Sequence, residues 1–367
     1  MSSKSMGVFE IFGSFVIALY AIWVVYLVMQ WRTARKSEES EEMLTSIAIV
    51  IAFRNEADHL QKLLPIITRE LQHTPYVELI LVDDGSEDDS LAIAKRHSSD
   101  RVRIISNEVK PGKKGAIHAG IMSTQAEWIH TLDADAQPGR EWLVQSARHI
   151  EAHQAADLLI FPVWMEDQRN FLTRLQEMEW LSILGVTGGM ALGGQPILCN
   201  GANLAYRKEL YKSFHNIRED WDIASGDDFF LLEYAKEVVW IHDTLAGVMI
   251  CAEPTLSGFM HQRVRWSGKT NLTKKRTTML LGAWVWLTNL MLILAPFMTD
   301  LWFMIWGIKV IVDALLMVSV SRWLCKRYSF WMYPILALIY PCYAIAVPLL
   351  GLIWPTKWKG RKIAISR

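Results

Sequence analysis

Long apolar regions at both ends of the chain constrain its fold more than any other feature. Residues 8–31 are apolar almost throughout, and about 20 such residues suffice for a helix to cross a bilayer. The basic residues Arg32, Arg35 and Lys36 follow this segment, whereas a cleaved signal peptide carries its basic region before the apolar run. We therefore expect an uncleaved N-terminal transmembrane helix. Because basic residues favour the cytoplasmic side, the chain after this helix is expected in the cytoplasm.

The C-terminal apolar region, residues 279–354, is expected to cross the membrane more than once. Two spans fit residues 280–298 and 301–320, which are joined by a short loop without a basic residue. Lys309 and Asp313 interrupt the second span. Since they are four residues apart, they lie on one helical face and can pair with each other.

The last apolar stretch, residues 328–354, is interrupted by Pro334, Pro341 and Pro348. An ordinary third span would place the basic tail that follows on the outer side, against the tendency of basic residues to stay inside. A re-entrant hairpin is therefore favoured for this stretch, and a third span is the alternative.

The central part, residues 44–270, has the mixed composition of a globular domain. About 225 residues can bury a full core as one α/β domain. The formal net charge of the chain is +0, which gives no reason to expect a nucleic-acid partner. The 4 cysteines form no CxxC pair, so neither a disulfide framework nor a zinc site is expected.

Short apolar runs alternate in this central part with segments of helical periodicity. Such alternation predicts a parallel sheet whose ligands bind at the carboxyl ends of the strands. A further helix is expected over residues 171–184, either packed on the sheet or lying at the membrane interface. The expected strands are residues 46–53, 77–82, 102–106 and 128–132, and the expected connecting helices are residues 56–71, 90–97 and 114–124.

Asp133 and Asp135 directly follow the fourth expected strand. In extended backbone, residues two apart point to the same side, so both carboxylates can approach one cation. Mg²⁺ is typically held by one or two carboxylates plus substrate phosphates, and it neutralises charge on a departing diphosphate. Taken alone, this pattern is more often a solvated turn or a helix cap.

Two further polar groups occupy comparable positions in the chain. Asp83 and Asp84 follow the second expected strand, where they suit either a turn with a helix cap or the recognition of a base and ribose. Lys114 lies at the start of an expected helix, which suits an anionic diphosphate, although a solvated basic turn is the ordinary explanation. The spacing GxxxxGK[ST] is missing here, which argues against an ATPase.

The end of the central part carries two more candidate groups. Asp227 and Asp228 precede an apolar run, and a partly desolvated carboxylate suits a general base, although a helix cap is again the alternative. Gln262, Arg265 and Trp266 follow. Trp offers a sugar or apolar acceptor a flat face and Arg can clamp phosphate, but a basic, aromatic helix beside a membrane is common in itself.

Taken together, the order and spacing of these groups resemble the family 2 glycosyltransferases, which are inverting enzymes with a GT-A fold. The resemblance covers about residues 46–270 and is strongest for the branch with cellulose, chitin and hyaluronan synthases and ceramide glucosyltransferases. It implies a Rossmann-like, nucleotide-sugar-binding α/β domain. The segments that carry it are IVIAFRNEADHL, LILVDDGSEDDS, KPGKKGAIHAGI, HTLDADAQP, CNGANLAYRKEL, SGDDFFLL and HQRVRW.

The resemblance implies a role for each candidate residue on the donor side. Asp135 would be the direct metal ligand, with Asp133 beside it, and the ion would be Mg²⁺ or Mn²⁺. Asp84, next to Asp83, would contact the uridine of a UDP-sugar, and Lys114 would lie near the diphosphate. The remaining implied donor-binding residues are Arg54, Asn55, Glu56, Gln262 and Arg265.

On the acceptor side, the resemblance implies that Asp228 is the catalytic base, with Asp227 adjacent. Trp266 would bind the acceptor, and Asn200 and Gly201 would line its site. The chain departs from the family at His118, where asparagine is more common, and in having few membrane spans.

These departures leave several functions open. Transfer of one sugar from a UDP-sugar to a lipid acceptor at the cytoplasmic membrane surface is favoured by the small membrane part. Processive polysaccharide synthesis is the first alternative and fits the Gln-x-x-Arg-Trp motif. A polyprenyl-phosphate sugar synthase is a further transferase alternative, but such enzymes generally lack that motif. A non-catalytic membrane scaffold is the alternative of another class.

Overall fold

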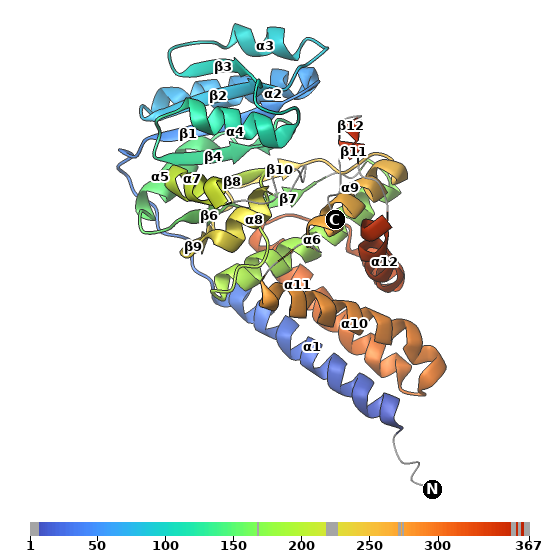
Figure 1. The fold of residues 1–367 in the computed structure, drawn as a ribbon. Helices are drawn as coiled ribbons and strands as arrows, with labels where there is room; N and C mark the ends of the chain where they lie inside the picture. Colours follow the sequence, from blue (N-terminus) through green and yellow to red (C-terminus); the bar gives the residue numbers. More distant parts are fainter. Residues whose placement is uncertain are drawn as a thin grey trace, which may run out of the picture. The chain divides into compact units, whose positions relative to one another are not determined.

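The computed structural model describes residues 7–166, 169–217, 227–270, 273, 275–353, 357–358 and 361–362. The chain divides into two compact units (Figure 1). The sheet unit comprises Ala34–Glu166 and Gly194–Cys251, together with Pro355–Arg367. The helical unit comprises Met1–Thr33, Asp167–Gly193 and Ala252–Trp354. The structure thus assigns two segments of the predicted central domain, 167–193 and 252–270, to the helical unit.

A seven-stranded sheet in the order β3-β2-β1-β4-β8-β6-β9 forms the core of the sheet unit (Figure 1). The strands β1 to β4 are parallel to one another, whereas β8 is antiparallel to both β4 and β6. The first four strands confirm the expected ones, and β8 makes the sheet mixed. The bounds are β1 Ile47–Phe53, β2 Val77–Asp83, β3 Val102–Ser106, β4 Trp128–Leu132, β6 Leu158–Ile160, β8 Asn203–Arg207 and β9 Val238–Trp240.

The strand order creates a switch point beside β1. The chain runs from β1 outward to β2 and β3, and then returns to place β4 on the other side of β1. In open α/β sheets, ligands bind in the crevice outside the carboxyl ends of the strands at such a point. The loops after Phe53, Asp83 and Leu132 all open at this edge, because their three strands are parallel.

Sequence explains why β1 lies at the centre of the sheet. Every residue of Ile47–Phe53 is apolar, and Ile49 to Ile51 are fully buried, as expected for a strand covered on both faces. Gly120 lets helix α4 approach this strand, because a Cβ atom at this position would lie 2.5 Å from Val50 Cγ1. The helices of the sheet unit are α2 Ala57–Glu70, α3 Ser90–Arg96, α4 Lys113–Ser123, α5 Trp142–Ala152, α7 Lys208–Ile217 and α8 Asp227–Tyr234, with the 3₁₀ turn η1 Leu71–His73.

Two smaller sheets complete this unit. One has the order β5-β10-β7, and the other pairs β11 with β12. Their bounds are β5 Gln137–Pro138, β7 Val163–Met165, β10 Val248–Ile250, β11 Lys357–Trp358 and β12 Arg361–Lys362.

Among its described residues, the helical unit contains four helices that are long and apolar enough to cross a membrane, with mean hydropathies between 1.8 and 2.4. Two of them match the predicted internal spans, and one matches the N-terminal anchor. Lys309 and Asp313 form the expected ion pair, and Tyr20 donates a hydrogen bond to Asp313 Oδ1 at 2.8 Å. The helices are α1 Val8–Thr33, α6 Phe171–Leu192, α9 Leu256–Thr270, α10 Arg276–Met298, α11 Trp302–Trp323 and α12 Tyr333–Ile353, with the 3₁₀ turn η2 Phe330–Met332.

The structure corrects one expectation, because α12 is a single continuous helix and not a re-entrant hairpin. Pro334 is its second residue, and the N–H groups at the start of a helix make no hydrogen bond within it, so proline costs no bond there. Pro341 and Pro348 each remove one hydrogen bond, but the proline φ angle fits a helix, and apolar helices in membranes tolerate such positions.

Helix α6 packs within the helical unit. Trp31 of α1 donates a hydrogen bond to the carbonyl oxygen of Gly185 at 2.8 Å. A Cβ atom at Gly185 would lie 2.9 Å from Leu316 Cγ of α11, so glycine permits this close contact.

Candidate functional site

The loop after β2 places Asp84 at the carboxyl edge of the sheet. Its side chain is buried, with 4% exposed. Both carboxylate oxygens accept the backbone N–H of Gly112 at 2.9 Å, and Asn107 Nδ2 donates to Oδ1 at 2.6 Å. The neighbouring Asp83 instead closes the local turn, because its Oδ1 accepts the N–H of Ser86 at 3.0 Å. The loop between β3 and α4 therefore fixes the orientation of Asp84.

The loop after β1 is bound to this same region. Asn55 adopts a left-handed backbone conformation with φ of 53°, which asparagine tolerates better than most residues, and its Oδ1 accepts the N–H of Glu87 at 2.8 Å. Glu56 donates its backbone N–H to Ser90 Oγ at 2.7 Å. Arg54 forms an ion pair with Glu87 at 2.9 Å. The three predicted residues thus lie beside the Asp83–Asp84 turn.

The loop after β4 brings the two acidic residues of the DxD pattern to the sheet edge. Asp133 forms an ion pair with Lys113, the first residue of α4. Burial alone would lower the pKa of Lys113, but the charges of Asp133, Asp228 and Asp135 raise it above its usual value. One lysine therefore lies in the field of three carboxylates.

The sequence singled out Lys114 as the cation at this position, and in the structure its neighbour Lys113 forms the ion pair with Asp133. Lys114 is buried with 5% exposed. Both lysines lie at the start of the same helix. In the sequence, they could be distinguished only by the direction in which each side chain points from that helix relative to the strand ends.

Asp135 lies near Asp133 with its side chain partly open to solvent. The surrounding protein and the charge of Asp133 raise the pKa of Asp135, while Lys113 and His59 act against this shift. Two neighbouring carboxylates of this kind present hard oxygen ligands and excess negative charge. This donor set fits Mg²⁺ or Mn²⁺.

The start of α8 brings Asp228 into the same constellation. Its Oδ2 accepts the backbone N–H of Gly201 at 3.0 Å, and a Cβ atom at Gly201 would lie 3.3 Å from Asp228 Cβ. The segment 200–202 also reaches β4, because the N–H of Asp133 donates to the carbonyl oxygen of Ala202 at 3.4 Å. Within this segment, Asn200 Oδ1 accepts the N–H of Ala202 at 3.0 Å.

The structure therefore brings together Asp133, Asp135, Asp228 and the segment 200–202 around Lys113. Asp227 is the first residue of α8, and its side chain lies outside the described part of the chain.

Gln262, Arg265 and Trp266 lie on α9 in the helical unit. Gln262 Nε2 donates to Glu253 Oε1 at 3.5 Å, and the ring centroid of Trp266 lies 5.5 Å from that of Trp180.

Comparison with known families bears directly on the sheet unit. Residues 48–214 match the model of Glycosyl transferase family 2. The chain contains a family 2 glycosyltransferase domain. The match confirms for this domain the resemblance to family 2 glycosyltransferases that the sequence predicted.

Among the relatives of this glycosyltransferase are enzymes that act on glycans and on lipids. It is 23% identical over 277 residues to poly-beta-1,6-N-acetyl-D-glucosamine synthase of Staphylococcus epidermidis, covering 71% of this chain and 65% of the relative. It is 26% identical over 263 residues to beta-monoglucosyldiacylglycerol synthase of Trichormus variabilis, covering 69% and 54%. The chain thus spans less than two thirds of the length of these relatives.

A solved structure shares the fold of the glycosyltransferase. It is a mannosyltransferase from Pyrobaculum calidifontis in complex with GDP-Man and Mn²⁺, with a TM-score of 0.55 and 13% sequence identity. The match covers 93% of this chain and 96% of that chain. The likeness confirms the expected GT-A fold.

A second acidic cluster of the glycosyltransferase was not predicted. One ligand atom each of Glu39, His149 and Asp243 lies within 4.8 Å of the others. The His149 ring contacts the Glu38 carbonyl oxygen at 2.7 Å through Nδ1 and Asp243 at 3.0 Å through Nε2, so both nitrogens face acceptors. Lys36 adds a cation at 3.6 Å from Asp243. Within the sheet unit, this cluster joins the segment after α1 to α5 and to the loop after β9, and it shares no residue with the predicted metal site.

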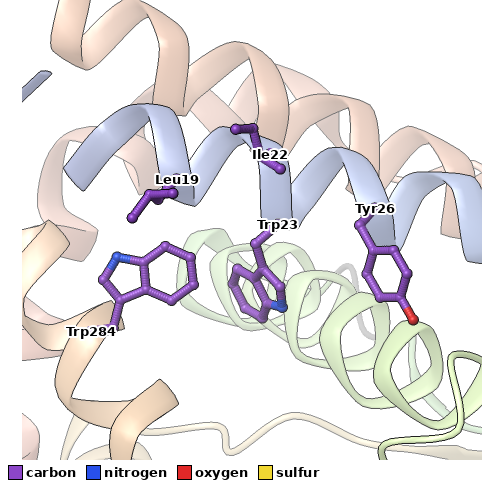
Figure 2. A pocket seen from close by; sticks show the side chains of 5 residues that line it. All are labelled: Leu19, Ile22, Trp23, Tyr26 and Trp284. Atoms are coloured by element: carbon purple, nitrogen blue, oxygen red, sulfur yellow. The ribbon is translucent and has the colours of Figure 1, made fainter. Parts of the chain in front are cut away.

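The helical unit of the glycosyltransferase has an aromatic cavity of about 480 Å³ (Figure 2). Trp23 Nε1 donates to Met190 Sδ at 3.4 Å, and the Tyr26 hydroxyl donates to the Gly193 carbonyl oxygen at 3.4 Å. Its walls belong to α1 and α10, both of which are candidate membrane spans. The lining residues are Leu19, Ile22, Trp23, Tyr26 and Trp284.

Proposed function

We propose that this glycosyltransferase transfers a single sugar from a UDP-sugar to a lipid-type acceptor at the cytoplasmic face of a membrane, with inversion at the anomeric carbon. The observation that carries the proposal is the arrangement of Asp133, Asp135 and Asp228 around Lys113 at the switch point of the sheet. The arrangement supports the proposal because two candidate metal ligands, a cation and a candidate base lie at one edge of the sheet.

The donor would enter along the carboxyl ends of β1 and β2. Asp84 is held by Gly112 and Asn107, and a carboxylate can accept more hydrogen bonds than these, so it can also receive one from the base or ribose. Arg54, Asn55 and Glu56 border the same region through their bonds to the loop after β2. Loops that are already held by such hydrogen bonds lose little conformational entropy on binding.

Asp135 and Asp133 would hold the divalent ion. When bound, the ion neutralises the negative charge on the leaving diphosphate. Lys113 contributes a further positive charge beside them, and its raised pKa keeps it protonated throughout the physiological range. The protein thereby offers a preorganised field for an anionic leaving group.

Asp228 would act as the general base. The N–H of Gly201 donates to its Oδ2 and holds the carboxylate in place. The carboxylate removes the proton of the acceptor hydroxyl as that oxygen bonds to the anomeric carbon. The bond from the anomeric carbon to the diphosphate oxygen breaks on the opposite face, which inverts the configuration and releases the nucleoside diphosphate. Base catalysis of this kind contributes roughly 10²–10⁴-fold.

A lipid acceptor is supported by the candidate spans and by the aromatic cavity of Figure 2, whose apolar lining suits a hydrocarbon chain. Trp266 would present a flat face to the acceptor. The likeness to a polysaccharide synthase supports processive synthesis as the second candidate, and the length of the product separates the two.

The decisive experiment supplies the purified protein, in native lipid extract, with UDP-glucose, UDP-N-acetylglucosamine or GDP-mannose and with Mn²⁺, Mg²⁺ or EDTA. We expect a metal-dependent, solvent-extractable product that carries one sugar from a UDP donor. A long product supports the polymerase, and preference for GDP-mannose overturns the assignment of UDP. Failure to transfer or hydrolyse any nucleotide-sugar would favour a non-catalytic scaffold.

A further inference from the structure

A buried ion pair holds the helix that carries the Gln-x-x-Arg-Trp motif. Arg263 lies inside this motif and has only 3% of its surface exposed, and its partner Glu179 on α6 has 4%. Arg263 Nη2 donates to Glu179 Oε2 at 2.7 Å, and Nε donates to Oε2 at 3.0 Å and to Oε1 at 3.2 Å. The guanidinium plane is therefore fixed by several bonds to one carboxylate.

A third helix completes this arrangement. The Tyr343 hydroxyl of α12 donates to Glu179 Oε1 at 2.8 Å, so both oxygens of the carboxylate have partners. The ring of Tyr343 also stacks on Phe259 of α9 at a centroid distance of 5.8 Å. Glu179 thus joins α6, α9 and α12 at a single buried point within the helical unit.

The guanidinium of Arg263 in turn contacts two predicted functional residues. Its Cζ lies 4.4 Å from the ring centroid of Trp266, which is three residues further along α9, in the geometry of a cation–π contact. Its Nη1 donates to Gln262 Oε1. On the other side, the ring of Phe259 lies 4.6 Å away, so the guanidinium is held between two aromatic rings.

We propose that Glu179, Arg263 and Tyr343 are positioning residues that fix the side chain of Trp266 for the acceptor. The inference rests on the proposed function, in which Trp266 binds the acceptor. Stability alone gives a weak reason for such a pair, since well-packed apolar residues of similar volume often replace a buried ion pair without loss of stability. A fixed guanidinium plane at Arg263 restricts the orientation of the neighbouring Trp266 indole, which the acceptor site requires.

The test uses a paired replacement, because removing one partner alone would leave a buried charge and could prevent folding. Glu179→Leu with Arg263→Met removes both charges and keeps an apolar contact. We expect a melting temperature within a few degrees of wild type and unchanged UDP binding. We expect the KM for the lipid acceptor to rise about tenfold or more, since displacement of a positioning group by about 1 Å can cost up to 10²-fold. Tyr343→Phe should give a smaller rise of a few-fold.

A matched control is available in the same unit. Lys309 and Asp313 form another ion pair between helical residues, and neither contacts Gln262 or Trp266 in the described part of the chain. Lys309→Met with Asp313→Leu should leave the acceptor KM unchanged.

The outcomes separate this inference from the proposed function. If Trp266→Ala raises the acceptor KM but the Glu179/Arg263 pair variant does not, the positioning role is overturned and the proposed function stands. A loss of activity in the pair variant that merely follows its folded fraction, with both KM values unchanged, also overturns it. If Asp228→Asn transfers sugar at the wild-type rate, the proposed function fails irrespective of the pair.

Discussion

At the scale of single residues, the two adjacent lysines at the start of α4 have different surroundings. Lys113 faces the carboxylates of Asp133, Asp135 and Asp228, whereas Lys114 is buried. We expect Lys113→Met to lower kcat with the UDP-sugar about 10²-fold, because a charge aimed at the leaving diphosphate stabilises the transition state. Steady-state kinetics of Lys113→Met and Lys114→Met, measured side by side, check this. A larger loss in Lys114→Met, at equal protein stability, would return the role to Lys114.

The candidate base gives the second residue-scale prediction. Asp228→Asn keeps an oxygen for the N–H of Gly201 but cannot accept a proton. We expect sugar transfer to fall by roughly 10²–10⁴-fold while binding of UDP and Mn²⁺, measured by calorimetry, stays near wild type. Loss of UDP binding in this variant would instead assign Asp228 to the donor site.

The buried carboxyl group of Glu70 leads us to expect that the stability of the fold depends on pH. Burial raises the pKa of this carboxyl from 4.5 to about 7, against the opposing hydrogen bond from the N–H of Leu143 at 2.8 Å. The fold therefore prefers the protonated form, and the free energy of unfolding decreases as the pH rises from 4.5 through 7. Glu70→Gln should remove about 1–2 kcal/mol of this dependence. Melting temperatures of both proteins between pH 5 and pH 8 measure it, and parallel curves would contradict it.

The proximity of Asp84, Asp133 and Asp135 was predictable because they follow apolar strands, and strand ends meet at one edge of a parallel sheet. Asp228 follows no strand, because it lies at the start of α8. Asn107 was not predictable, since it acts only by holding Asp84 from another loop. The pairing of Arg263 with Glu179 was also beyond prediction, because 84 residues separate them and only the packing of α6 on α9 brings them together.

At the scale of elements, the approach of α4 to the sheet depends on Gly120. A Cβ atom there would lie 2.5 Å from Val50 Cγ1 and 3.1 Å from Val82 Cγ2, and both are stiff, β-branched side chains. We expect Gly120→Ala to reduce the free energy of unfolding by about 1–3 kcal/mol, the usual cost of overpacking. Gly139→Ala is the control, since no atom lies within 4 Å of its Cβ position. Equal melting temperatures for the two variants would show that α4 can shift freely.

Elements with continuous apolar runs were predicted well, as β1 illustrates. Strand β8 was not, because its sequence Asn203–Arg207 has polar residues at both ends. Asn203 is fully buried, and its amide donates to the carbonyl oxygens of Pro162 and Ala246 while its Oδ1 accepts from Trp142. These partners come from distant segments of the chain. The sequence alone therefore cannot reveal that the buried side chain of Asn203 has hydrogen-bond partners.

At the scale of the whole molecule, contacts within the helical unit bear on membrane topology. Thr299, between α10 and α11, donates to Glu10 at the start of α1 at 2.9 Å. The ring centroids of Trp31 and Trp323 lie 4.9 Å apart, and these residues are near the ends of α1 and α11. The start of α1 and the loop 299–301 therefore belong on one side, and the ends of α1 and α11 belong on the other.

Exposed cysteines can test the proposed sides. Cys251 and Cys325 are both exposed, and the proposed topology places both in the cytoplasm. We expect a membrane-impermeant maleimide to label single-cysteine variants at these positions only in inverted vesicles, and to label Asp300→Cys only in right-side-out vesicles. The opposite pattern would place the sugar donor site on the outer side.

Because the chain leaves the sheet unit at residue 167 and returns at 194, the glycosyltransferase domain cannot be cut out as one continuous piece. A fragment of residues 34–251 would keep α6 but lose α1 and α11, whose side chains pack against Gly185 and Gly189. The apolar face of α6 would then meet water, and we expect the fragment to aggregate. We therefore expect the sheet unit to stay folded and soluble only when it is expressed together with α1 and α11, against which α6 packs.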